Sequence, residues 1–156
     1  NVPGRTGSNL SPATTIRLAK DFKNIVASKE ASGSFAQFNE ILRDKPADFL
    51  LISGDDPVTL PMIALGAVGI ISVVGNAYPK EVATLAQLAL AGDFVAARKY
   101  HNKLLAITDM CFAEGNPCGV KYILKEKGFG QDTLRLPLVP IGAALKEKIK
   151  IEMQNI

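Results

Sequence analysis

A lysine at the end of a short apolar run is the residue with the clearest potential for chemistry. Residues 24–28 have the length and composition of a buried strand, and Lys29 follows them directly, ahead of small, turn-forming residues. Because side chains alternate along a strand, Lys29 shares a face with Ile25 and Ala27. An apolar surrounding favours the neutral amine, which is the form that attacks a carbonyl group to give a Schiff base. The alternative is a lysine that reaches solvent from a strand end.

An arginine near the start of the chain is suited to binding a carboxylate. Arg5 is flanked by Pro3, Gly4 and Gly7, so residues 1–7 are expected to form a loop rather than a strand. In a loop the guanidinium group is free to present its rigid fork of donors, and that fork matches the geometry of a carboxylate. The alternative is a surface arginine in a loop.

Two adjacent carboxylates and a glycine follow the next apolar segment. The sequence Gly54-Asp55-Asp56 comes directly after residues 49–53. Adjacent carboxylates suggest a magnesium ion or general acid–base work, but a helix cap explains them equally well. Gly54 has no Cβ, so its backbone carbonyl can closely approach a bound molecule.

The remaining residue types argue against several other chemistries. His101 is the only histidine and is expected on a helix surface, which argues against histidine-based catalysis and against zinc. Ser8, Ser53 and Ser72 have no base partner in the sequence pattern. The glycines form neither a P-loop nor a dinucleotide fingerprint. These residues therefore favour neither a zinc site nor a nucleotide cofactor.

The composition bounds the class of protein. The chain has 156 residues, of which 47% are hydrophobic and 21% charged, as is typical of a soluble globular protein. A net charge of +3 is too small to indicate nucleic acid or a membrane surface, and the apolar run at residues 62–74 is too short to span a bilayer. The spacing of Cys111 and Cys118 fits neither a zinc pair nor a redox dithiol, so we expect buried free thiols and a cytoplasmic location.

Strands and helices are expected to alternate through the first part of the chain. The expected strands are residues 24–29, 49–53 and 70–74, and the expected helices are residues 12–21, 35–43 and 57–65, the last with Asp56 as its N-cap. Short connections favour parallel strands with right-handed crossovers. Residues that carry chemistry then gather at the carboxyl ends of the strands, whether the sheet is a TIM barrel or an open doubly wound sheet. Periodicity does not choose between these two folds.

The second part of the chain is expected to be wholly helical. Helices are expected at residues 81–90 and 93–110, then from Asn116 to Gly128, and finally from near Pro140 to the end. The composition changes near Gly92. We therefore expect two domains, residues 1–91 and residues 92–156.

Four motifs together resemble one known family. They are Asn1-Val2-Pro3-Gly4-Arg5-Thr6-Gly7, the lysine strand, Leu50-Leu51-Ile52-Ser53-Gly54-Asp55-Asp56 and Gly69-Ile70-Ile71-Ser72-Val73. In order and spacing they resemble the dihydrodipicolinate synthase branch of the pyruvate-dependent class I aldolases and lyases. The resemblance implies the C-terminal half of a TIM (β/α)8 barrel, followed by a C-terminal helical domain. It also implies a homo-oligomer, a dimer or a tetramer, for the complete protein, and a reaction that uses no metal ion and no cofactor.

The resemblance also implies roles for individual residues. Lys29 would form the Schiff base with pyruvate, and Arg5 would hold the carboxylate of the aldehyde, which in this branch is aspartate semialdehyde. The carbonyl of Gly54 would contact substrate, and Ile71 would line the wall against the Schiff base. The family's proton-relay tyrosine and its pyruvate-carboxylate site would precede Asn1. The chain is therefore expected to be an incomplete lyase, inactive alone. The alternatives are another 2-keto-acid aldolase of the family, or a non-catalytic half-barrel that serves in oligomerisation.

Overall fold

The chain divides into two compact units. A computed structural model describes residues 1–156, all of the sequence. The first unit consists of Asn1–Ser72 and Ala86–Phe94, and the second of Val73–Leu85 and Val95–Ile156. No helix in the chain combines the length and the apolar character needed to cross a bilayer.

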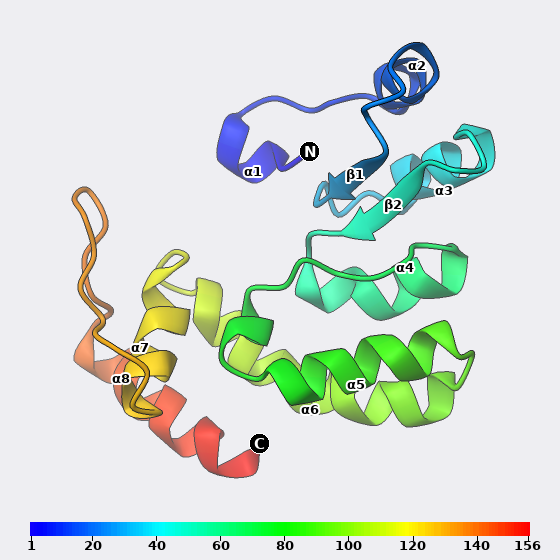
Figure 1. Ribbon diagram of the computed structural model, residues 1–156. Coiled ribbons are helices and arrows are strands. Elements are labelled where there is room, and N and C mark those ends of the chain that lie inside the picture. Colours follow the sequence, from blue (N-terminus) through cyan, green and yellow to red (C-terminus); the bar gives the residue numbers. More distant parts are fainter. The chain divides into compact units, whose positions relative to one another are not determined.

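A small parallel sheet organises the first unit. Strands β1 (Ala27–Glu30) and β2 (Leu50–Ser53) lie side by side (Figure 1). In their parallel register Lys29 is opposite Ile52. On the other side of β1, the backbone nitrogen of Asn1 donates to the Lys29 carbonyl at 2.8 Å and Ala31 donates to the Asn1 carbonyl at 2.9 Å. These two bonds form the pattern of a parallel pair. The expected parallel arrangement is confirmed.

The third expected strand, residues 70–74, is wrong. Only Ile70 forms a bridge, to Ser53, and residues 74–76 form the short 3-10 helix η2 (Val74–Asn76). The reason is that β2 ends at Ser53, so residues beyond Ile71 have no strand beside them to pair with. Strand β1 also begins three residues later than expected, at Ala27.

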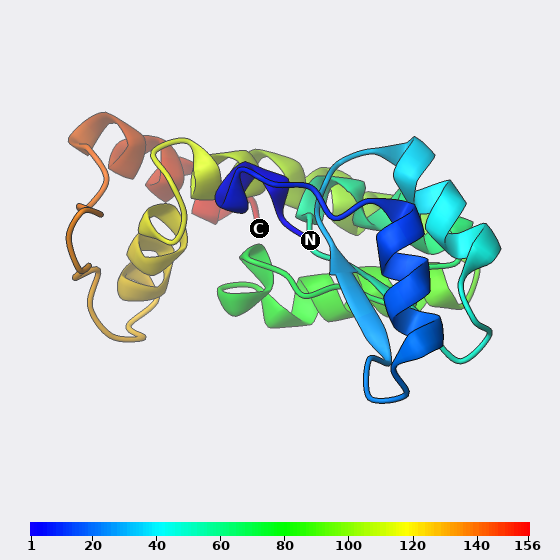
Figure 2. The same ribbon diagram turned by 90° about the horizontal axis from the view of Figure 1, so that it is seen from above.

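Helices cover the face of the sheet opposite Lys29. They are α2 (Pro12–Asp21), α3 (Phe35–Asp44) and α4 (Thr59–Leu65). Ser11 and Ser34 cap α2 and α3 by accepting from the backbone N–H three residues on, which fixes where each helix starts. Helix α2 packs beside α3, as Figure 2 shows. The buried core between sheet and helices contains Phe38, Ile41, Leu51, Met62 and Ala67.

Two local expectations in the first unit are wrong. Residues 1–7 were expected to be loop, but Pro3–Thr6 form the single turn α1, which Gly7 ends with a φ of 66°. Proline at the first position favours such a turn, because its φ is already helical. Asp56 does not cap a helix: it is the first residue of the 3-10 helix η1 (Asp56–Val58), which leads into α4.

The second unit is built from helices. Helix α5 (Pro79–Leu90) passes from the second unit into the first, and α6 (Phe94–Phe112), α7 (Cys118–Glu126), α8 (Ala143–Glu152) and the 3-10 turn η3 (Met153–Asn155) follow. Helix α8 begins later than the expected start near Pro140. The two cysteines are free and buried, as expected.

Candidate active site

All four predicted site residues lie in the first unit. Lys29 is the third residue of β1 and is half-buried. Its neighbours along the strand, Ser28 and Glu30, point to the opposite, helix-covered face, where Glu30 is fully buried. The lysine side chain therefore leaves the sheet on the face that α3 and α4 do not cover, close to the carboxyl end of the strand.

Lys29 and Gly54 are in direct contact. A Cβ added at Gly54 would lie 2.7 Å from Cε and 2.9 Å from Cγ of Lys29, and 3.0 Å from the Cβ of Ala31. Such distances are shorter than carbon atoms tolerate, so only glycine leaves room for the lysine stem. The backbone N–H of Gly54 donates to the Glu30 carbonyl at 2.8 Å, which fixes the two segments against each other.

Ile71 follows the bridge that extends the sheet beyond β2. Its backbone N–H donates to the Ser53 carbonyl at 2.8 Å, and its side chain is 52% exposed. Ser53 directly precedes Gly54, so Ile71 lies at the same strand end as the glycine that contacts Lys29.

Arg5 lies in the segment that follows Asn1, the residue whose backbone pairs with β1. Residues 2–9, called the arginine loop below, begin at the carboxyl end of that pairing and include α1. The Arg5 side chain is exposed. Parallel pairing places the carboxyl ends of neighbouring strands at one edge of the sheet. Lys29, one of the last two residues of β1, therefore lies at the same edge as Gly54, Ile71 and the arginine loop, which follow strand ends.

Asp55 and Asp56 form hydrogen bonds with nearby hydroxyl groups of the first unit. Burial, and then the charge of Asp56, raise the pKa of Asp55 above its ordinary value. The Asp55 backbone carbonyl accepts from the hydroxyls of Ser53 at 3.0 Å and Thr59 at 2.9 Å. The Asp56 carboxylate accepts from the Ser72 hydroxyl. No group of three or more His, Cys, Asp or Glu side chains gathers where an ion could be held.

One feature of the site was not predicted from the sequence. Glu30 is fully buried and accepts hydrogen bonds from Asn1, Ser32 and Gln37. Charged residues are usually exposed, so a glutamate next to a strand lysine gives little reason to expect burial. The signal was the alternation itself, because it places Glu30 on the covered face whenever Lys29 is on the open one.

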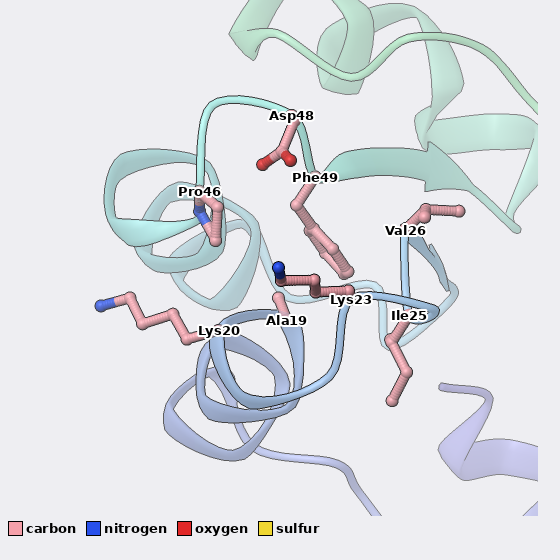
Figure 3. Close-up of a pocket in the computed structure, with 8 residues that line it drawn as sticks. All are labelled: Ala19, Lys20, Lys23, Ile25, Val26, Pro46, Asp48 and Phe49. Carbon is pink, nitrogen blue, oxygen red and sulfur yellow. The ribbon is translucent and has the colours of Figure 1, made fainter.

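A cavity of about 420 Å³ lies at the other edge of the sheet. Figure 3 shows its lining residues, which come from the end of α2 and from the segments before β1 and β2: Ala19, Lys20, Lys23, Ile25, Val26, Pro46, Asp48 and Phe49. These segments precede the strands, whereas Lys29 and Gly54 stand at strand ends. The cavity is therefore separate from the candidate active site.

The chain matches known proteins along its whole length. The model of the dihydrodipicolinate synthetase family covers residues 1–156. The 4-hydroxy-tetrahydrodipicolinate synthase of Phocaeicola vulgatus is 52% identical over 156 residues, which are 100% of this chain and 52% of that protein. The enzyme of the same name from Flavobacterium psychrophilum is 48% identical over 97% of this chain and 52% of its own length.

Solved structures give the same result. A crystal structure of dihydrodipicolinate synthase from Aquifex aeolicus matches with a TM-score of 0.96 and 39% identity, over 99% of this chain and 53% of that one. A structure described as the first monomeric dihydrodipicolinate synthase variant matches with a TM-score of 0.95 and 37% identity, over the same shares. The chain spans about half the length of the curated relatives it matches. On this sequence and structural likeness, the chain belongs to the dihydrodipicolinate synthetase family.

Proposed function

We propose that the protein containing this chain is a lyase that condenses pyruvate with aspartate semialdehyde, as a 4-hydroxy-tetrahydrodipicolinate synthase in the route to diaminopimelate and lysine. The observation that carries the proposal is the contact of the Lys29 stem with Gly54 at the carboxyl edge of a parallel sheet. The 52% identity to a relative with that name supports the choice of reaction.

Lys29 supplies the covalent chemistry. Its neutral amine attacks the ketone carbon of pyruvate, water leaves, and a Schiff base forms. Loss of a methyl proton turns this adduct into an enamine, whose carbon attacks the aldehyde to form the new carbon–carbon bond. The amino group of aspartate semialdehyde then attacks the carbon of the Schiff base, which closes the ring of the product and releases the Lys29 amine. The reaction needs no metal ion and no cofactor, because the iminium nitrogen itself accepts the electron pair.

The other three residues bind and orient. Arg5 holds the carboxylate of the aldehyde substrate with its guanidinium fork. The carbonyl of Gly54 contacts the bound substrate, and Ile71 forms the wall beside the Schiff base. The exposure of the Arg5 and Ile71 side chains in the first unit is compatible with these roles.

The proposal extends to the architecture of the longer protein. Residues 1–91 would form the C-terminal half of a (β/α)8 barrel and residues 92–156 a C-terminal helical domain. The 156-residue chain alone would lack turnover, because the nucleophile and its proton relay act as a unit. The protein would act in the cytoplasm as a homodimer or homotetramer. One solved relative is a monomeric variant, so sedimentation of the complete protein decides its oligomeric state.

Variants of the complete protein test whether Lys29 binds pyruvate and Arg5 binds the aldehyde. Lys29→Ala removes the covalent bond to pyruvate, so it should abolish both turnover and borohydride trapping of pyruvate. Arg5→Ala should leave trapping intact and lower kcat/KM for the aldehyde by about 30- to 1,000-fold, as expected for a lost charged hydrogen-bond pair. Lys23→Ala, at the opposite edge of the sheet, is the matched lysine control and should change neither. Loss of trapping in Arg5→Ala would show that the two roles are not separate.

A further inference from the structure

A fully buried carboxyl group lies directly after Lys29 but on the other face of the sheet. Glu30 is 0% exposed. Its oxygens accept from Asn1 Nδ2 at 3.1 Å, from Gln37 Nε2 at 3.0 Å and from the Ser32 backbone N–H at 2.7 Å. A buried carboxyl group destabilises the fold unless donors satisfy it, and three donors from three segments meet this one.

The same donors tie down both ends of the arginine loop. At the first end, the side chain of Asn1 accepts from the Leu10 backbone N–H at 2.9 Å. At the second end, Gln37 Nε2 donates to the Leu10 carbonyl at 3.2 Å, and Asn9 Nδ2 donates to Gln37 Oε1 at 3.0 Å. Both ends of the arginine loop are therefore held at one place, where the Glu30 carboxyl group accepts hydrogen bonds from Asn1 and Gln37.

This arrangement links the positions of Lys29 and Arg5, although the side chain of neither contacts Glu30. The Asn1 backbone is hydrogen-bonded to the backbone of Lys29 and Ala31. These bonds hold the start of the arginine loop in a fixed position beside β1. Arg5 lies between the two tied ends. A change at Glu30 would loosen both ends of the loop without removing any group from the open face of the sheet.

We propose that Glu30 is a positioning residue, whose buried carboxyl group holds the arginine loop against β1 and so sets the place of Arg5 relative to Lys29. The inference rests on the proposed function, because it assigns Arg5 to the aldehyde and Lys29 to pyruvate. Glu30 acts through Arg5 and does not touch substrate, since its side chain points to the helix-covered face.

Two variants of the complete protein weaken the network at different points. Glu30→Gln keeps the shape but replaces an acceptor oxygen by an amide that faces donors. It should lower kcat/KM for the aldehyde by about 10- to 100-fold, the scale of a small misplacement of a binding group. Pyruvate trapping should stay within about twofold of the parent protein, since Lys29 still binds pyruvate. Asn9→Ala removes an exposed side chain from the same network and should give a smaller loss of the same kind. Glu40→Gln, on the exposed side of α3, is the matched control and should leave every constant unchanged.

A double-mutant cycle separates positioning from mere stability. If Glu30 works through Arg5, adding Glu30→Gln to Arg5→Ala should produce almost no further loss of kcat/KM for the aldehyde. A purely structural role would lower the melting temperature and leave the kinetic constants of the folded enzyme unchanged. That result, or additive losses in the cycle, would overturn the proposal. If Glu30→Gln fails to fold, Asn9→Ala is carried through the same cycle.

The assay also distinguishes failure of the inference from failure of the proposed function. If the parent protein yields no borohydride-trapped pyruvate on Lys29, the proposed function itself is wrong, and the positioning role falls with it. If trapping is normal while Glu30→Gln and Asn9→Ala keep the parent KM and kcat for the aldehyde, only the positioning role is wrong.

Discussion

The two units each contain a glycine in a place where no side chain fits, but different groups fill the space. At Gly54 in the first unit, an added Cβ would meet the Cε and Cγ atoms of Lys29. At Gly119 in the second unit, it would lie 2.7 Å from the Cα of Cys111 and 2.7 Å from the carbonyl oxygen of Met110, both in the backbone of α6. One glycine admits a reactive side chain, and the other lets two helices approach.

The group that each glycine faces determines which property of the protein it controls. A lysine stem has several rotatable bonds, so it can move away from a methyl group at little cost to the fold. A helix backbone cannot move without separating the helices that pack on it. Substitution at Gly54 should therefore damage chemistry, whereas substitution at Gly119 should damage stability.

The largest expected effect is at Gly54. In Gly54→Ala the new methyl group should force Lys29 into another rotamer, and the rate of pyruvate trapping should fall by about 100-fold, the scale associated with a displacement of about 1 Å. The melting temperature should change little. Gly142→Ala is the control, because its Cβ would meet Glu114 only at 3.5 Å, an ordinary contact. Trapping at the parent rate in Gly54→Ala would show that the lysine does not depend on this gap.

The next effect is at Gly119. Gly119→Ala should destabilise the protein by about 1–3 kcal/mol, the usual range for an overpacked site. Denaturant unfolding measures this loss. The rate of pyruvate trapping by the protein that remains folded should be unchanged, because Gly119 belongs to the second unit and Lys29 to the first. A stable Gly119→Ala variant with impaired trapping would contradict the separation of roles.

The smallest effect concerns pH and is confined to the second unit. Burial, followed by nearby negative charges, raises the pKa of Tyr78 to about 12 from its ordinary value of 10. A raised pKa means that the folded state favours the neutral phenol. The resulting stabilisation is complete below pH 10 and is lost as the pH rises from 10 to about 12.

Comparison with a phenylalanine variant isolates this titration. Across that window the parent protein should lose about 1–2 kcal/mol more of unfolding free energy than Tyr78→Phe, a figure discounted for partial solvent screening. Near neutral pH, Tyr78→Phe should be about as stable as the parent, since the Tyr78 hydroxyl bonds to no protein atom and the Lys127 ammonium 3.5 Å above the ring is retained. The same alkaline loss in both proteins would exclude Tyr78 as its source.

The parts of the fold that could be predicted from sequence depend on neighbours along the chain. The serine caps of α2 and α3 and the proline at the start of α2 act within one helical turn, and the bounds of both helices agree with the pattern to within one residue. Residues 70–74 have strand composition, but a strand needs a partner, and β2 ends too early to supply one. Pairing of this kind involves residues that are distant in sequence, so local composition does not show it.

In the candidate site, too, local features could be predicted from the sequence, whereas contacts between segments could not. The pattern indicated that Gly54 matters because it lacks a Cβ, yet the contact that this permits with the Lys29 stem depends on the register of two strands. Glu30 was missed, because its burial is compensated by donors from other segments: Asn1, which is distant in sequence, and Gln37, which lies on the next helix. The roles assigned to Lys29, Arg5, Gly54 and Ile71 stay predictions.

Locating the pyruvate adduct on the chain decides whether Lys29 is the Schiff-base lysine. The complete protein is incubated with pyruvate, reduced with borohydride, digested and sequenced by tandem mass spectrometry. We expect a single modified lysine, Lys29, and no adduct in Lys29→Ala. An adduct on any other lysine, or none on the active parent protein, would contradict this expectation.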